Sequence, residues 1–185
     1  MRVLRTIGNN VSTVKSMSRT DYSARPSGPI LALDLGSKSV GAAVSDQLLI
    51  TIKRLTPIKR SSWKHLLIDV RDLIERFDAK TLVIGLPLAM DGSRTSAALD
   101  VDRLAMNFVR SLHLPVYLQD ERLTSVEASQ KLREAGYSNV EIRELVDGEA
   151  AALILGDFLQ LTAEEQETRL LDPNKVDPQG NLNRE

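Results

Sequence analysis

The clearest hydrophobic pattern near the start of the chain is an apolar run over residues 30–35, which a single acid, Asp34, interrupts. A turn-forming tetrad, Gly-Ser-Lys-Ser, separates this run from a second run of small apolar residues over 40–44. A strand, a tight turn and another strand predict a β-hairpin. Alternating side chains over 48–54 predict a third strand, so we expect the chain to open with an antiparallel meander.

Asp34 is out of place in a buried strand. An unpaired buried charge costs several kcal/mol or forces the group to become neutral. The strand therefore needs a partner for Asp34, and a cation is the strongest one. The alternative is structural, because Asp side chains often cap turns such as the one at Gly36.

Downstream of the meander, helical and extended patterns alternate. Apolar residues three and four positions apart predict amphipathic helices, and short continuous apolar runs predict buried strands. The expected elements are helices over 63–77, 96–112 and 126–135, strands over 81–86 and 115–119, and a last helix. Because a helix between two buried strands makes a βαβ unit, these two strands should be parallel. The fold class is therefore α/β, with a mixed five-stranded sheet flanked by helices.

Acids recur where these elements end or begin. Asp120 and Glu121 follow the 115–119 strand, at the strand end where α/β sheets place their sites. Neighbouring strand residues point to opposite sides, so we expect one of the two acids to be functional and the other structural. Asp147 precedes the apolar run over 150–155 and is expected in the first turn of the last helix, where the helix dipole favours an acid.

The two ends of the chain show no convincing apolar period. Residues 1–29 carry five basic residues and one acid, whereas residues 161–185 carry six acids and three basic residues. We interpret them as a disordered N-terminal extension and a disordered acidic tail around one domain over 30–160. An organelle transit peptide, or a true start at Met17, is the alternative for residues 1–29.

Composition narrows the chemistry further. No apolar run approaches the ~18 residues of a membrane span, so we expect a cytoplasmic protein without a membrane partner. The chain has no cysteine and two histidines, which argues against disulfides, thiolate sites and a multi-histidine zinc centre. A catalytic metal would be held by oxygen atoms, which favours Mg²⁺ or Mn²⁺. A formal charge of −1 gives no support for a uniformly basic nucleic-acid surface.

Three acids from separate elements, Asp34, Glu121 and Asp147, could converge. Three converging carboxylates would hold divalent metal. Two such ions, about 4 Å apart, clamp the attacking and leaving oxygens of a phosphodiester. A nuclease of this kind needs neither cysteine nor histidine.

Four motifs carry a resemblance to a known family. They are DLGSKSVGAAVSD (34–46), VIGLPLAMDGS (83–93), QDERLTS (119–125) and VDGEAAALIL (146–155). In this order and spacing the chain resembles the YqgF-type proteins of the ribonuclease H-like superfamily, described as nucleases of precursor 16S ribosomal RNA and as Holliday-junction-resolvase-like. The resemblance covers about residues 30–160. It implies a ribonuclease H-like fold, a metal-dependent nuclease and an acidic triad of Asp34, Glu121 and Asp147.

The resemblance also suggests roles around the triad. Asp34 would bridge the two metal ions, and Glu121 and Asp147 would complete the coordination. Candidate phosphate contacts are Lys38, Arg94 and Arg122, each of which could equally be an ordinary surface cation. The loop over 85–92 should lie on the substrate side.

Two residues depart from the family pattern. Ser39 stands where the family usually has an arginine, so one candidate phosphate-binding cation is missing. Glu149 stands where an apolar residue is usual, close to Asp147, and we interpret it as a surface residue rather than a fourth ligand.

Other functions stay open. The substrate is expected to be precursor ribosomal RNA, with branched DNA as the alternative. A resolvase acting on a two-fold junction would dimerise, whereas an RNA-trimming enzyme can be a monomer. A non-catalytic nucleic-acid-binding module is a further alternative. An actin-like or sugar-kinase-like ATPase is excluded, because such enzymes close two sheet domains on the nucleotide and one unit of this size leaves no room for the second.

Overall fold

The computed structural model describes residues 25–122, 130 and 132–172 of the chain. Its centre is a mixed sheet in the order β3-β2-β1-β5-β6, with β4 pairing with β2 beside this path. The strands are β1 (Ile30–Asp34), β2 (Ser39–Ser45), β3 (Ile52–Arg54), β4 (Ile58–Lys59), β5 (Thr81–Leu86) and β6 (Val116–Asp120). Pairing is antiparallel between β1 and β2 and between β2 and β3, and parallel from β1 through β5 to β6. The expected meander, parallel pair and α/β class are confirmed.

Two details of the sheet differ from the prediction. The third strand begins at Ile52 rather than at 48, because the carboxylate of Asp46 accepts the backbone N–H groups of Ile50 and Thr51 and folds the segment before it into a turn. The sheet also has a sixth strand, since β4 returns to pair with the start of β2. That strand spans two residues, too few for a hydrophobic period to reveal it.

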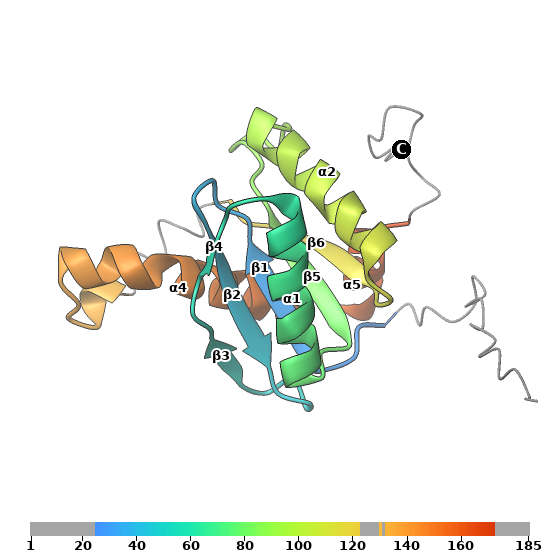
Figure 1. The fold of residues 1–185 in the computed structure, drawn as a ribbon, viewed down its shortest axis with the longest axis horizontal. Coiled ribbons are helices and arrows are strands. Elements are labelled where there is room, and N and C mark those ends of the chain that lie inside the picture. Colours follow the sequence, from blue (N-terminus) through green and yellow to red (C-terminus); the bar gives the residue numbers. More distant parts are fainter. Residues whose placement is uncertain (1–24, 123–129, 131, 173–185) are drawn as a thin grey trace, which may run out of the picture.

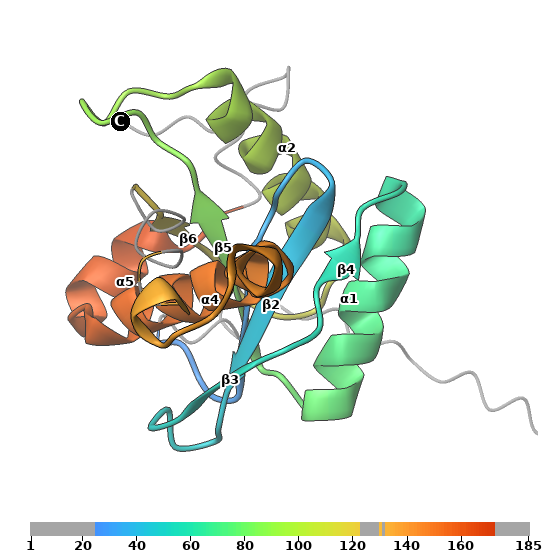
Figure 2. The same ribbon diagram turned by 90° about the vertical axis from the view of Figure 1, so that its left-hand side faces the viewer.

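Helices cover both faces of the sheet. Helices α1 (Trp63–Phe77) and α2 (Ser96–Ser111) lie on one face, and α4 (Asn139–Gln160) and α5 (Ala163–Arg169) lie on the other (Figures 1 and 2). Side chains that alternate along each strand therefore enter two separate cores. Leu31, Leu33 and Ile84 belong to the core under α1 and α2, whereas Ile30, Ala32 and Val83 pack with residues of α4.

The last long helix starts earlier than predicted. Helix α4 begins at Asn139, so Asp147 lies in its third turn rather than in its first. The side chains of Ile142 and Ala150, before and after Asp147 in this helix, are both buried. Because Gly148 and the acids beside it look like a helix start, the sequence pattern concealed the helix before them.

The C-terminal side of the domain is more ordered than predicted. Helix α5 starts with a capping box, in which the side chain of Thr162 accepts the N–H of Glu165 and the carboxylate of Glu165 accepts the N–H of Thr162. Beyond it, Leu171 is buried and its N–H donates to the carbonyl of Val116 at the outer edge of β6. The prediction of a disordered tail from 161 is therefore wrong for 163–172. Residues 1–24 and 173–185 lie outside the described residues.

Half of the helix expected over 126–135 falls outside the described residues. Helical backbone is described at Gln130 and at 132–134. It ends as predicted at Gly136, which has a φ of 86°, and the N–H of Tyr137 donates to the carbonyl of Leu132. This is the C-terminal glycine motif that closes many helices. Within the described part of the chain, no helix is both long and apolar enough to cross a membrane.

Candidate functional site

Asp34 ends β1 at the edge where the parallel strands finish. It lies opposite Gly41 in the β1–β2 ladder, so both positions face the same side of the sheet. A Cβ atom at Gly41 would overlap the backbone carbonyl of Asp147. Helix α4 therefore crosses β2 so closely that only a glycine leaves room for it. This crossing brings Asp147 to the end of β1 that carries Asp34.

The carboxylate of Asp147 has one polar partner in the sheet. The hydroxyl of Ser39, at the start of β2, donates a hydrogen bond to Oδ2 of Asp147. This contact spans the hairpin and α4, and it points the carboxylate back toward the strands. The sequence marked Ser39 only as a departure from the family pattern, whereas the structure makes it a direct neighbour of a candidate site residue.

Glu121 follows β6 and turns toward the face that α4 covers. Its carboxylate lies over Gly85, since a Cβ at that glycine would overlap Oε2 of Glu121 and press on Ile154 of α4. Oε2 of Glu121 is buried without a hydrogen-bond partner among the described residues. Burial raises the pKa of Glu121 to about 8, and the negative charges of Asp34 and Asp120 add to the rise.

Asp34 is electrostatically linked to both other acids. Burial raises the pKa of Asp34 to about 6, and the negative charge of Asp147 adds to the rise. The turn after β1 does not use the Asp34 side chain, because the N–H of Gly36 donates to the backbone carbonyl of Asp34 instead. Over the described ranges, no lysine, arginine or histidine forms an ion pair with any of the three acids. The cation expected beside Asp34 is therefore not a described side chain.

The three acids share one end of the α4 face but do not form a closed ligand cage. Among the residues that the structure describes, no group of three or more acidic or histidine side chains is arranged to hold a metal ion. The donor set nevertheless suits a hard divalent cation, because it consists of carboxylates and includes a buried oxygen without a partner.

Asp120 takes the structural role expected for one of the adjacent acids. Its carboxylate accepts the backbone N–H and the guanidinium of Arg122, with a shortest distance of 2.7 Å from Nη2. The guanidinium of Arg122 also donates to the carbonyl of Met90, 3.3 Å away in the loop after β5. Arg122 thus ties the predicted substrate-side loop to the end of β6.

The other two basic candidates differ from each other. Arg94 forms an ion pair with Asp102, which is buried on α2, so a neighbouring acid already neutralises Arg94. Lys38 is exposed in the β1–β2 turn. Glu149 is paired with Arg54 at 2.8 Å and is only 16% exposed, so it joins α4 to β3 rather than standing free at the surface.

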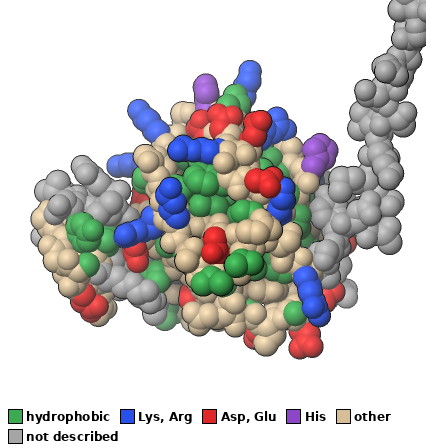
Figure 3. Space-filling view, turned by 90° about the horizontal axis from the view of Figure 1, so that it is seen from below, with side chains coloured by type: hydrophobic (Ala, Val, Ile, Leu, Met, Phe, Trp, Pro, Cys, Tyr) green, Lys and Arg blue, Asp and Glu red, His purple; other side chains and the backbone are tan. Residues whose placement is uncertain are grey.

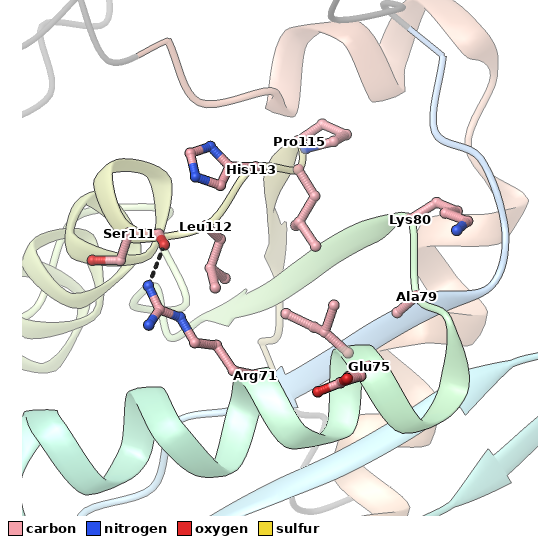
Figure 4. A pocket seen from close by; sticks show the side chains of 10 residues that line it. Arg71, Glu75, Ala79, Lys80, Ser111, Leu112, His113 and Pro115 are labelled. Atoms are coloured by element: carbon pink, nitrogen blue, oxygen red, sulfur yellow. Dashed lines mark hydrogen bonds between the residues drawn. The ribbon is translucent and has the colours of Figure 1, made fainter. Parts of the chain in front are cut away.

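A groove at the far end of the sheet is separate from the acids. It lies between the end of α1 and the loop that leads into β6, and its lining includes Arg71, Lys80 and His113 (Figure 4). The guanidinium of Arg71 reaches across it to the carbonyl of Ser111 at 2.8 Å. Pro115 and Lys80 precede β6 and β5, so this groove lies at the amino ends of those strands and the acids lie at the carboxyl ends.

Surface charge alone does not indicate where a ligand binds. The face seen from below in Figure 3 carries basic side chains interspersed with acidic ones, without a continuous patch of one sign. This agrees with the near-neutral formal charge of the chain. Recognition of a polyanion would therefore depend on local contacts rather than on the overall field.

Comparison with known proteins identifies the family. The model of the RuvX family, described as "Holliday junction resolvase", matches residues 28–161. A protein from Anaeromyxobacter sp. is 39% identical over 129 residues, which cover 70% of this chain and 94% of that protein. A protein from Koribacter versatilis is 40% identical over 133 residues, which cover 72% and 87%. Both carry the name "Putative pre-16S rRNA nuclease".

Solved structures of resolvases are more distant. Thermus thermophilus RuvC in complex with a Holliday junction substrate is 15% identical, with a TM-score of 0.45, and the match covers 77% of this chain and 98% of that one. The Fowlpox virus resolvase in complex with Holliday junction DNA is 16% identical, with a TM-score of 0.45, and the match covers 72% and 97%. The family match and the close relatives give the assignment, and the observed mixed sheet with helices on both faces agrees with the fold expected from it. This chain belongs to the RuvX family.

Proposed function

We propose that this protein is a divalent-metal-dependent nuclease that processes the 5′ end of precursor 16S ribosomal RNA, with Asp34, Glu121 and Asp147 as its catalytic acids. The single observation that carries the proposal is the gathering of these acids at one end of the α4 face, with no described basic side chain paired to them. Membership of a resolvase family and the names of the close relatives support hydrolysis of phosphodiesters. The cytoplasm is the compartment that we propose for this activity.

The site suits two Mg²⁺ or Mn²⁺ ions in its donor chemistry. The chemistry supplied by such bound cations is polarisation of the phosphodiester and a lower pKa for the attacking water. Asp34 interacts electrostatically with both other acids, so it is the residue best placed to be shared between the ions. Ser39 holds the carboxylate of Asp147, and the packing of Gly85 against Glu121 fixes that side chain.

Residues around the acids would bind the nucleic acid. Lys38 is exposed in the β1–β2 turn and can neutralise a backbone phosphate. Arg122 orders the 85–92 loop through Met90, and Arg94 is engaged by Asp102. We therefore assign direct phosphate contact to Lys38 first and support of the loop to Arg122 and Arg94.

Cleavage of branched DNA is the second candidate function, and the description of the matching family as "Holliday junction resolvase" favours it. Both functions need the same acids, so the substrate must decide between them. Because a Holliday junction is two-fold symmetric, a resolvase should act as a homodimer, whereas RNA trimming is compatible with a monomer.

The experiment is a cleavage assay of the full chain with Mg²⁺, with Mn²⁺ and with chelator. A labelled precursor 16S RNA fragment and a four-way DNA junction serve as substrates. We expect metal-dependent cutting of the RNA, lost in Asp34→Asn and retained in Asp100→Asn, which removes an exposed acid on α2. Cutting of the junction alone would transfer the assignment to a resolvase. Binding of either substrate without cutting would leave only the binding-module alternative.

A further inference from the structure

A second groove adjoins the acids on the α5 side. It has a volume of about 490 Å³, within the range of about 300–1,000 Å³ that is usual for ligand sites. Three elements form it. Gln119 and Arg122 come from the end of β6, Asp157 and Gln160 from the last turns of α4, and Arg169 from α5.

The position of this groove follows from the acid site. Glu121 lies between Gln119 and Arg122 in the sequence, so the groove and the acid site share the end of β6. Ile154 of α4 and Glu121 both pack over Gly85, which places this part of the helix beside Glu121. Asp157 is three residues further along α4, or about 4.5 Å along the helix axis. The groove therefore begins about one helical turn from Glu121.

The lining contains a buried polar group without a partner. Gln119 is 5% exposed, and its side-chain N–H donates to the carbonyl of Asp120 at 3.2 Å. Its Oε1 has no hydrogen-bond partner among the described residues. Leaving a buried acceptor unsatisfied costs stability, about 1–3 kcal/mol. Such a cost is understandable if the oxygen is used when a ligand is bound.

The charges of the groove indicate which part of a ligand it accepts. Three acids, Asp120, Asp157 and Glu165, outnumber the two arginines, Arg122 and Arg169. Arg122 is occupied by Asp120, and Arg169 acts on Glu165, whose pKa it helps to lower. Because each of these arginines already faces an acid of the lining, the groove offers little attraction to a phosphate. It suits an uncharged group with several donors and acceptors, such as the edge of a nucleobase.

Part of the groove lies outside the family region. The family match ends at residue 161, and α5, with Glu165 and Arg169, follows it. The chain after α5 is fixed to the edge of β6 through Leu171, which holds the helix in place. The groove is thus completed by a helix that follows the residues matched by the family model.

From this position and lining we propose that the groove between β6, α4 and α5 is a nucleobase subsite, which receives an unpaired base of the nucleic-acid substrate close to the bond that is cut. The proposal rests on the proposed nuclease function for its substrate class. Gln119 and Gln160 contact the base edge, and Glu121, about one helical turn away, lies near the neighbouring phosphate.

The test measures binding, so that it does not depend on cleavage. The full chain is titrated, in Ca²⁺ or chelator, into a short fluorescein-labelled single-stranded RNA, its DNA counterpart, and versions of both in which single bases are replaced by abasic sites. Two groove variants are used. Gln119→Met keeps the shape of the side chain but removes its amide, and Gln160→Ala removes an exposed amide at the end of α4. Gln47→Ala, an exposed amide in the β2–β3 loop, is the matched control.

We expect each groove variant to weaken binding of the intact strand by about three- to tenfold, the range for a lost hydrogen bond. When the abasic site replaces the base that the groove receives, the same variants should bind that strand as tightly as the wild type does. Gln47→Ala should bind every strand as the wild type does. Equal weakening on intact and abasic strands, or no weakening at all, would overturn the subsite. The RNA and DNA arms show which strand the groove accepts.

Cleavage of the same strands with Mg²⁺ separates the two proposals. A wild type that binds with the expected dependence on one base but cuts nothing overturns the nuclease function and leaves the subsite standing. If the wild type cuts the strands but the groove variants weaken binding of intact and abasic strands equally, the subsite is overturned and the nuclease function stands.

Discussion

The two faces of the central sheet are built from the same strands and have opposite properties. Under α1 and α2, alternate residues of β1, β5 and β6 are large and apolar, and they pack into one continuous core. Under α4, the strands still bury apolar side chains such as Ile30 and Val83, but their carboxyl ends carry glycines and Asp34. Three polar atoms on this face, Oε2 of Glu121, Oε1 of Gln119 and the hydroxyl of Tyr117, are buried without partners among the described residues. The first face stabilises the fold. On the second face, buried polar groups without partners lower the stability of the fold and leave carboxylates and an amide available to a ligand.

The contrast is sharpest at adjacent residues of one strand. Leu33 is fully buried in the apolar core, and Asp34, the next residue, faces α4 with a raised pKa. Substitution of Leu33 should therefore lower mainly stability, and substitution of Asp34 should lower mainly activity.

The largest expected effect is on catalysis from the α4 face. Asp34→Asn, Glu121→Gln and Asp147→Asn should each lower kcat/KM by more than about a hundredfold, since even residues that only support metal ligands cost about 10–100-fold when changed. Far-ultraviolet circular dichroism should stay unchanged. By contrast, Leu33→Ala should destabilise the fold by about 2–5 kcal/mol in urea unfolding while the folded fraction stays active. Full activity in Glu121→Gln would remove that residue from the site.

The next effect concerns how closely α4 approaches the sheet. In Gly41→Ala the new methyl group would overlap the backbone of Asp147, so α4 must move away from β2. We expect destabilisation of about 1–3 kcal/mol or more and loss of cleavage. Gly148→Ala is the matched control, because its Cβ would lie 3.4 Å from the carbonyl of Leu55, and alanine favours the helix by about 1 kcal/mol. If thermal unfolding gave the same Tm for both variants, that result would contradict the close crossing of α4 over β2.

A smaller effect appears in the pH dependence of stability. The pKa of Glu121 is about 8 in the folded protein against an ordinary value of 4.5, so the folded state keeps a proton that the unfolded chain releases in this range. The contribution of Glu121 to the stability of the metal-free protein should therefore be fully present below pH 4.5 and should be lost as the pH rises toward 8. Asp34 contributes in the same direction up to about pH 6.

Glu121→Gln isolates that contribution. In chelator, its Tm should exceed that of the wild type at pH 8 and should approach it at pH 4.5, since glutamine resembles the protonated acid. The difference is read from differential scanning calorimetry at the two pH values. A Tm advantage that stayed constant with pH would mean that Glu121 is charged in the folded protein.

The smallest effect is expected at Ser39. Ser39→Ala removes the hydroxyl that donates to Asp147 and should lower kcat/KM by about three- to tenfold, with little change in Tm. Ser39→Thr keeps a hydroxyl and should restore most of the activity. An inactive threonine variant with normal stability would show that the hydroxyl is not what matters at this position.

Patterns local in sequence predicted most of the fold. The hairpin around Asp34, helix α1 and the parallel strands were all readable from alternation and apolar runs, because neighbours in the chain determine them. The short β4 was missed because it depends on pairing with β2. The early start of α4 and the order of α5 were missed because Ile142 and Leu171 become favourable only when the rest of the fold is present to bury them.

The candidate site was predictable in its residue types but not in its contacts. The interrupted apolar run at Asp34 and the adjacent acids at the end of β6 marked positions where ordinary packing fails. Sequence alone could not show that Ser39 binds Asp147, that Arg94 is engaged by Asp102, or that Gln119 keeps an unpaired oxygen. Each of these contacts joins residues that are brought together only by the packing of α2, α4 or the strand ends.

The most direct test of the account is a Mn²⁺ titration of the full chain, followed by electron paramagnetic resonance at pH 8, with Asp34→Asn and Asp100→Asn beside the wild type. We predict that the wild type and Asp100→Asn bind two ions per chain and that Asp34→Asn loses at least one of them. Identical binding by all three proteins would contradict the central claim that the acids on the α4 face hold the metal.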